Sequence, residues 1–170
     1  LFGGALQNDY QFTVYDELWS LTASGWSLAS EGVPLTAPAG TGGITHVFDD
    51  ARHVWVTVAT SLSADPLVYE WDLRRRVQVT PGTTDSPPPR QGFGAATYDP
   101  ENHRVLLFGG RQCAHFYAPG LCDTFSYAND LWSWNGAVFT NLTPTSGPLP
   151  TGRYFAQLTW DHGRHRAVLT

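Results

Sequence analysis

Long apolar runs, lysine and methionine are all missing from this sequence. No stretch approaches the roughly 18 consecutive apolar residues that a membrane-spanning helix needs, so the sequence predicts no membrane span. No hydrophobic period of 3.6 is sustained over about ten residues, which argues against amphipathic helices. The formal net charge is −5 and no basic stripe is present, so nucleic acid is not an expected partner.

Methionine is absent even from position 1, where Leu1 begins the chain inside a strand-like motif. We therefore expect a processed chain, a fragment or part of a larger protein. A signal peptide would have been lost with the preceding residues.

Glycine and proline are plentiful, with 17 and 12 residues, and they lie between the apolar runs instead of inside them. Hydrophobic residues make up 42% of the chain and aromatic residues 14%. This profile is typical of many short strands and not of a disordered chain. A chain of 170 residues is long enough for one domain with a sizeable core.

Residues 87–142 contain four short apolar runs, each closed by a turn signal or a linker. The runs are Gln91–Tyr98, Val105–Phe108, Leu131–Trp134 and Val138–Leu142. Asn135-Gly136, between the last two runs, is a strong hairpin signal, because a type I′ turn needs positive φ at both central residues. The pattern predicts a four-stranded antiparallel meander.

This unit recurs on both sides. An aromatic residue followed by Asp occurs at Phe48-Asp49, Tyr98-Asp99 and Trp160-Asp161. The third run repeats as Asp16-Glu17-Leu18-Trp19, Val68-Tyr69-Glu70-Trp71 and Asn129-Asp130-Leu131-Trp132. Leu1-Phe2-Gly3-Gly4 repeats Leu107-Phe108-Gly109-Gly110. We interpret the three repeated tryptophans as core residues between neighbouring units.

These motifs resemble the kelch repeat, in the variant common in bacterial secreted proteins. The matching pieces are the proline-rich lead into Arg90 and Arg153, the apolar strand into Gly-Gly, and Asn-Asp-Leu-Trp-x-Trp-x-Gly at 129–136. The middle repeat departs from the pattern, with Ala59-Thr60 in place of Gly-Gly and Arg74-Arg75-Arg76 at the turn. The resemblance implies an all-β fold, a β-propeller of four-stranded antiparallel blades around a channel.

The resemblance divides residues 1–170 into about three blades' worth of a partial kelch-type propeller. The pieces are a half blade at 1–29, blades at 44–80 and 91–142, and a half blade at 154–170. Three blades do not close a ring, and open halves would expose strand edges. Either the chain is a segment of a larger propeller, or two copies exchange halves across a two-fold axis to close a six-bladed ring. The missing methionine favours the segment.

The expected connections differ in length between the two faces of such a fold. On one face the turns are short, such as Asp99–His103 and Ser24-Gly25. On the other face the connections are long: Ala5–Asp16, Glu31–Gly43, Pro81–Pro89, Arg111–Ala128 and Pro144–Gly152. Binding is expected on the long-loop face, because long loops on a rigid scaffold commonly carry function.

The insertion Gln112–Tyr127 is the richest of these connections. Its candidate binding residues are His115, Phe116, Tyr117, Phe125 and Tyr127. Aromatic side chains on a stiffened loop suit contact with a protein or a sugar, because they offer large area at low entropic cost. The alternative is that they pack the insertion against its neighbour, as Tyr10, Phe12 and Tyr15 would in the upstream connection.

Cys113 and Cys122 lie inside this insertion, and we expect a disulfide that clips it. A disulfide favours an oxidising compartment. Together with the resemblance, which implies a bacterial source, it predicts a secreted, periplasmic or cell-surface protein. One alternative is that both cysteines are free thiols. Another is a metal site formed by the two cysteines and His115, although the spacing of these residues matches no common zinc pattern.

Arg90 and Arg153 open the innermost strands and are candidates for an anion or carboxylate clamp near the channel mouth. Their repetition favours a structural role instead, in which each arginine bonds linker carbonyls and braces adjacent blades. Arg74, Arg75 and Arg76 are interpreted as a solvated turn.

Enzyme motifs such as G-x-S-x-G and H-E-x-x-H are missing, and neither a cofactor nor a metal is expected. The first functional hypothesis is a non-catalytic protein-binding or assembly module of an exported bacterial protein, with a protein partner or the rest of the propeller as its contact. The second is the propeller portion of a secreted oxidase or carbohydrate-active enzyme with its catalytic groups outside this chain.

Overall fold

A computed structural model describes residues 2–8, 11–30, 41–72, 76–79, 81–82, 85–119 and 121–170, and within these ranges all regular structure is antiparallel β-strand. The expected all-β class with four-stranded antiparallel sheets is confirmed. Among the described residues no helix is present that could cross a membrane.

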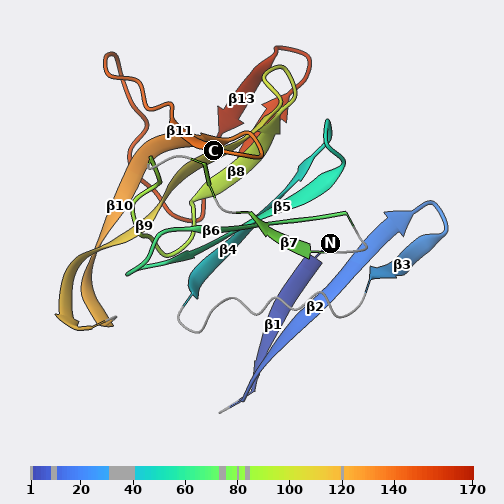
Figure 1. Ribbon diagram of the computed structural model, residues 1–170, viewed down its shortest axis with the longest axis horizontal. Helices are drawn as coiled ribbons and strands as arrows, with labels where there is room; N and C mark the ends of the chain where they lie inside the picture. Colours follow the sequence, from blue (N-terminus) through green and yellow to red (C-terminus); the bar gives the residue numbers. More distant parts are fainter. Residues whose placement is uncertain are drawn as a thin grey trace.

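The strands form four sheets that follow the chain in order (Figure 1). The first has the order β1 (Phe2–Asn8), β2 (Gln11–Thr22), β3 (Gly25–Ser30). The second is β4 (Thr41–Asp49), β5 (Val54–Ser61), β6 (Leu67–Trp71), β7 (Arg76–Val79). The third is β8 (Ala95–Asp99), β9 (Arg104–Ala118), β10 (Leu121–Trp134), β11 (Phe139–Asn141). The fourth is a pair, β12 (Leu158–Asp161) and β13 (Arg166–Leu169).

The repeated aspartates organise the turns between the first two strands of three sheets. Oδ1 of Asp49, Asp99 and Asp161 accepts the backbone N–H of the third following residue, at 3.0, 3.2 and 3.2 Å. Each turn ends on a histidine in the left-handed region, and these are His53, His103 and His165. The side chain holds the turn closed, so we infer a structural role for these carboxylates.

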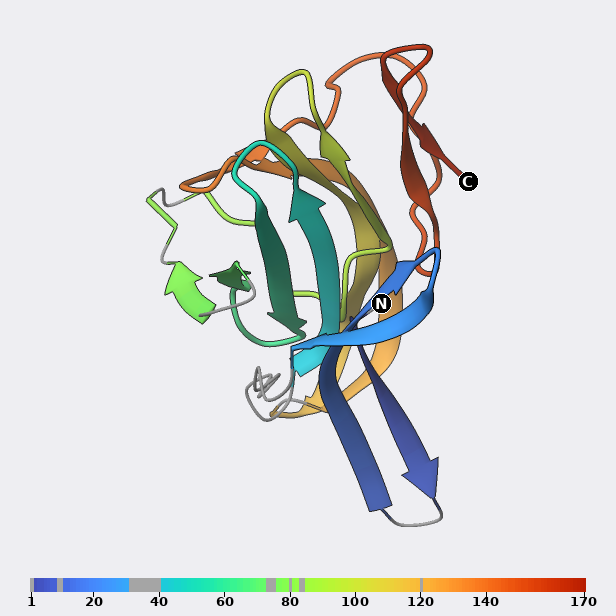
Figure 2. The same cartoon turned by 90° about the vertical axis from the view of Figure 1, so that its right-hand side faces the viewer.

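The core lies between the second and third sheets, which pack against each other (Figure 2). Valines of β5 and β6 meet the aromatic side chains of β10 and β11, among them Trp132, Trp134 and Phe139. Glu70 ties the two sheets together, because its carboxylate accepts Trp134 Nε1–H at 3.0 Å and pairs with Arg52 at 2.7 Å. Trp71 and Trp132 are 2% and 3% exposed, as expected of core residues. Trp19, on the first sheet, is half-buried.

The first strands of successive sheets lie side by side, because β8 contacts β4 on one side and β12 on the other. Glycine permits the first approach: a Cβ on Gly43 would lie 2.6 Å from Gly92 Cα. The second approach includes a hydrogen bond from the Ala156 amide to the Gly94 carbonyl at 3.0 Å. Three sheets in chain order therefore meet along β4, β8 and β12.

The turn at Asn135-Gly136 differs from the sequence prediction. Gly136 has φ of 97°, but Asn135 does not have positive φ, and four residues separate β10 from β11. Asn135 Oδ1 accepts the amides of Ala137 and Val138, each at 3.0 Å. The hairpin forms as predicted, but the type I′ geometry is wrong, because the asparagine side chain closes a longer turn.

The first and fourth sheets are separate sheets among the described strands. Large apolar side chains are exposed on both: Leu21 at 63% and Trp26 at 57% on the first, and Phe155 at 90% next to the fourth. Of the arginine run, Arg76 begins β7, whereas Arg74 and Arg75 lie outside the described residues. The packing expected for Tyr10, Phe12 and Tyr15 also concerns side chains outside them.

Burial lowers the pKa of His46 from 6.5 to about 4, and its Nδ1 lies 3.0 Å from Thr57 Oγ1. The unfolded chain therefore takes up this proton near pH 6.5 and the folded chain only near pH 4, so stability is lost as the pH falls between these values. We expect the free energy of unfolding to fall by about 2 kcal/mol between pH 7 and pH 5. Urea denaturation of wild type and His46→Gln checks this; an equal fall in the variant would contradict it.

Candidate functional site

The insertion between the second and third strands of the third sheet is not a loop, as the sequence suggested, but a long hairpin. β8 pairs with β9 only as far as Phe108, apart from one bridge between Gln91 and Arg111, and β11 pairs with β10 only as far as Trp132. Beyond these points β9 and β10 continue as a two-stranded ribbon (Figure 1). The upstream connection Ala5–Asp16 is corrected in the same way, because β1 and β2 pair as far as Asn8 and Gln11.

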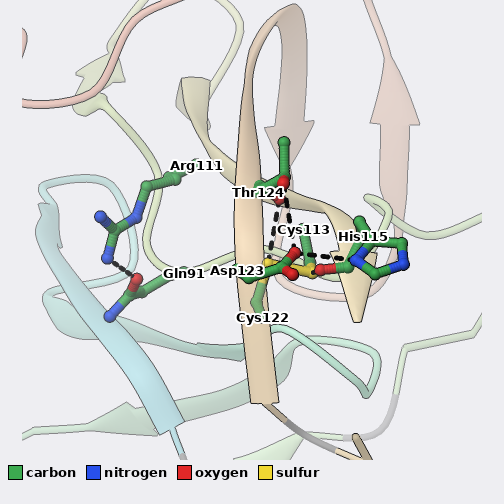
Figure 3. Close-up of a disulfide and its surroundings, with 7 residues drawn as sticks. All are labelled: Gln91, Arg111, Cys113, His115, Cys122, Asp123 and Thr124. Carbon is green, nitrogen blue, oxygen red and sulfur yellow. Dashed lines mark hydrogen bonds and ion pairs between the residues drawn. A yellow bond between two sulfur atoms is a disulfide. The ribbon is translucent and has the colours of Figure 1, made fainter. Parts of the chain in front are cut away.

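Cys113 and Cys122 form a disulfide across this ribbon, with 5.8 Å between their Cα atoms (Figure 3). The expected disulfide is confirmed, and the alternatives of two free thiols and of a metal site on these sulfurs are wrong. The register of the ribbon shifts at several points around Cys122 and Thr124. The covalent link therefore fixes a stretch in which the ladder of backbone hydrogen bonds is irregular.

The ribbon presents aromatic side chains to solvent. Phe116, Tyr117 and Tyr127 are 41%, 62% and 55% exposed. His115 is also exposed, and its Nδ1 lies 2.8 Å from Asp123 Oδ1. These four side chains are therefore exposed and do not pack the ribbon against a neighbouring sheet in the part of the chain that the structure describes.

Phe125 is half-buried and lies under Arg111, whose guanidinium carbon is 4.1 Å from the ring centroid. Arg111 was not among the residues singled out from the sequence. It also lies 5.5 Å from the Tyr154 ring centroid, and its Nη2 donates to Gln91 Oε1. Arg111 and Gln91 face away from the disulfide in Figure 3. The base of the ribbon is thus joined to the strand entries by a cation–π contact.

Arg90 is fully buried, and its guanidinium is occupied by protein groups. Nη1 and Nη2 donate to the two carboxylate oxygens of Asp130 at 2.9 and 2.8 Å, and Nη1 also donates to the Gly109 carbonyl at 2.6 Å. Nε donates to the Pro88 carbonyl at 3.0 Å. This geometry favours the bracing role over an anion clamp, because no donor faces solvent.

Burial of Asp130 would by itself raise the pKa of its carboxyl group. The hydrogen bonds and positive charge of Arg90, together with the indole N–H of Trp132, outweigh burial and hold that pKa below its ordinary value. The pair is therefore ionised at neutral pH. Each charge of the Arg90–Asp130 pair is stabilised only while the other residue of the pair is present.

Arg153 repeats part of the Arg90 arrangement. Its Nε donates to the Thr151 carbonyl two residues earlier at 3.1 Å, just as Arg90 bonds Pro88. Its backbone amide bonds Ala128 at 3.2 Å, and its carbonyl accepts the Gly110 amide at 3.0 Å. Among the described residues no carboxylate pairs with Arg153, so this part of the structure shows only the backbone half of the brace.

A separate groove of about 250 Å³ lies beside the second sheet, away from the ribbon. It is lined by Val54, Glu70, Trp71, Asp72, Val77 and Val79. Within the described part of the chain no group of three or more His, Cys, Asp or Glu side chains could hold a metal ion. The ribbon, with its exposed aromatic side chains and its covalent link, remains the arrangement best suited to contact another molecule.

Comparison with known proteins adds no identification: no family model matches the sequence, and no curated protein matches it.

Proposed function

We propose that this chain is part of a kelch-type β-propeller and that it serves as a non-catalytic protein-binding or assembly module of an exported bacterial protein. The partner binds the disulfide-linked ribbon of β9 and β10, at residues 112–127. The observation that carries this proposal is that the ribbon extends beyond its sheet with Phe116, Tyr117 and Tyr127 exposed.

The arrangement of the sheets supports the propeller. In a propeller the innermost strands of successive blades are neighbours around an axis, and here β8 lies between β4 and β12. The core between the second and third sheets is formed by facing sheets, as between adjacent blades. The Arg90 brace and its partial copy at Arg153 support repeated blade junctions.

The composition of the ribbon supports protein binding. Aromatic side chains bury large areas with few rotatable bonds and are enriched at the energetically important positions of interfaces. The disulfide reduces the number of conformations open to the unbound ribbon, which lowers the entropic cost of binding. A disulfide is also typical of proteins outside the reducing cytosol, which supports export.

The proposal is tested by selecting binders from a display library of random peptides against the oxidised protein. Selected peptides are then titrated against Phe116→Ser/Tyr117→Ser/Tyr127→Ser and against the disulfide-free Cys113→Ser/Cys122→Ser. We expect the aromatic variant to bind at least about tenfold more weakly, because interface aromatics commonly contribute more than 1 kcal/mol each. The disulfide-free variant is expected to lose affinity through a more flexible ribbon.

Val77→Ser/Leu28→Ser is the matched control, because it removes apolar side chains that are 44% and 38% exposed on β7 and β3, outside the ribbon. Its affinity should equal that of the wild type. Peptides that bind the wild type and the aromatic variant equally, or a library that yields no binder, would contradict the proposal.

A further inference from the structure

A row of adjacent planar groups lies at the base of the ribbon, where the linkers enter the first strands. Phe155 and Tyr154 have ring centroids 4.2 Å apart. The row continues through the Arg111 guanidinium, 5.5 Å from Tyr154, to Phe125, 4.1 Å from Arg111. The end of the row at Phe155 is open, because this side chain is 90% exposed.

The backbone of Phe155 has φ of 58°. A bulky residue in this region is unfavourable and persists where surrounding structure or function requires it. The corresponding position after Arg90 is Gly92, with φ of 70°, which adopts this conformation without steric cost. The chain thus places an exposed aromatic ring where glycine would be the unstrained choice.

Arg111 carries a charge that no described carboxylate neutralises. Five other arginines, namely Arg52, Arg90, Arg104, Arg164 and Arg166, lie within 4.0 Å of an Asp or Glu oxygen. Within the described ranges Arg111 donates to the amide oxygen of Gln91, and its buried Nε has no hydrogen-bond partner there. Its Nη1 bonds no described residue, so the guanidinium retains capacity for an anion beside the rings.

We propose that Phe155, Tyr154 and Arg111 form a binding site for a saccharide ring that bears a carboxylate, such as a uronic acid unit. The flat face of the sugar stacks on the exposed ring of Phe155, which is tilted by 51° from the ring of Tyr154. The carboxylate binds Arg111, with Gln91 holding the guanidinium in place. An acidic peptide would bind Arg111 through charge but would not require the exposed ring of Phe155. A saccharide with a carboxylate uses both groups, so it is the favoured ligand. This site goes beyond the protein-binding ribbon and shares only Phe125 with it.

Titration calorimetry with tetragalacturonate as the probe tests the site in the full chain, with cellotetraose as the uncharged comparison. We expect Arg111→Gln to weaken binding at least about tenfold, through loss of the charged hydrogen bonds. Phe155→Gly should weaken binding at least about fivefold while its Tm stays unchanged or rises, because glycine relieves the positive φ. Cellotetraose should bind more weakly than tetragalacturonate.

Arg166→Gln is the matched control for charge, since Arg166 at the start of β13 lies 4.0 Å from Asp161 at the end of β12; its affinity should equal that of the wild type. The proposal is overturned if tetragalacturonate does not bind the wild type at millimolar concentration, or if Phe155→Gly binds as tightly as the wild type. It is also overturned if hexaglutamate binds as tightly as tetragalacturonate. Peptide binding at the ribbon should be unaffected by Phe155→Gly, so failure here leaves the proposed function intact.

Discussion

Replacing Asp130 with alanine is expected to lower the free energy of unfolding by about 3–5 kcal/mol, because it leaves a buried guanidinium without its carboxylate. Arg90 is fully buried and makes two hydrogen bonds to Asp130, at 2.9 and 2.8 Å. The remaining acceptors, the Gly109 and Pro88 carbonyls, do not neutralise the charge. Urea denaturation at pH 7, followed by tryptophan fluorescence, measures the loss.

Asp123→Ala is the matched control for this substitution. Asp123 is 46% exposed, and its partners among the described residues are the exposed His115 and the adjacent Thr124, so a loss below about 1 kcal/mol is expected. The double variant Arg90→Met/Asp130→Leu removes both charges and should recover much of the stability. A loss in Asp130→Ala no larger than that in Asp123→Ala would show that the buried pair does not brace the third sheet.

Trp134→Ala is expected to cost about 3–5 kcal/mol, because it creates a large cavity between two packed sheets. The side chain is fully buried, its ring centroid is 4.8 Å from that of Phe139, and its indole N–H reaches Glu70 on the neighbouring sheet. Trp26→Ala makes the same chemical change on the first sheet, at a side chain that is 57% exposed. There we expect a loss below about 1 kcal/mol.

Chemical denaturation of both tryptophan variants at one pH compares them directly, with thermal unfolding as a second readout. Equal losses would contradict the inference that the core lies between the second and third sheets. They would instead indicate that Trp26 is buried in solution.

The strands were largely predictable from the sequence because their signals are local. Glycine, proline and Asp-containing turns separate short apolar runs, and Val105–Phe108 and Leu131–Trp134 fall inside β9 and β10. The repeated Trp71 and Trp132 also marked the core, where both are buried. The recurrence of tryptophan at one position of the repeat therefore predicted which side chains are buried.

The ribbon was missed as a pair of strands because its apolar alternation is interrupted. Register shifts between Leu121 and Phe125 break the two-residue period that identifies a strand. The disulfide was predicted because Cys113 and Cys122 lie in one insertion. The structure shows that the two strands of the ribbon bring the two side chains together.

The contacts of Arg111 and the backbone conformation of the turn histidines were not predicted, for different reasons. The contacts of Arg111 with Phe125 and Tyr154 join segments far apart in sequence, so no local pattern marks them. His53, His103 and His165 each follow a repeated aspartate by four positions, and this spacing was visible in the sequence. Their left-handed backbone was not expected, because glycine or asparagine is the more common residue there.

The second, third and fourth sheets meet along their first strands, where β8 contacts both β4 and β12. Nuclear Overhauser measurements on the isotope-labelled chain test this arrangement most directly. We expect cross-peaks between the backbone protons of Gly43 and Gly92, where a Cβ on Gly43 would lie 2.6 Å from Gly92 Cα. We also expect cross-peaks between Gly94 and the amide of Ala156, which are joined by a 3.0 Å hydrogen bond. Absence of both sets, with the pairing inside each sheet intact, would contradict the contact of β8 with β4 and β12, and the proposed propeller with it.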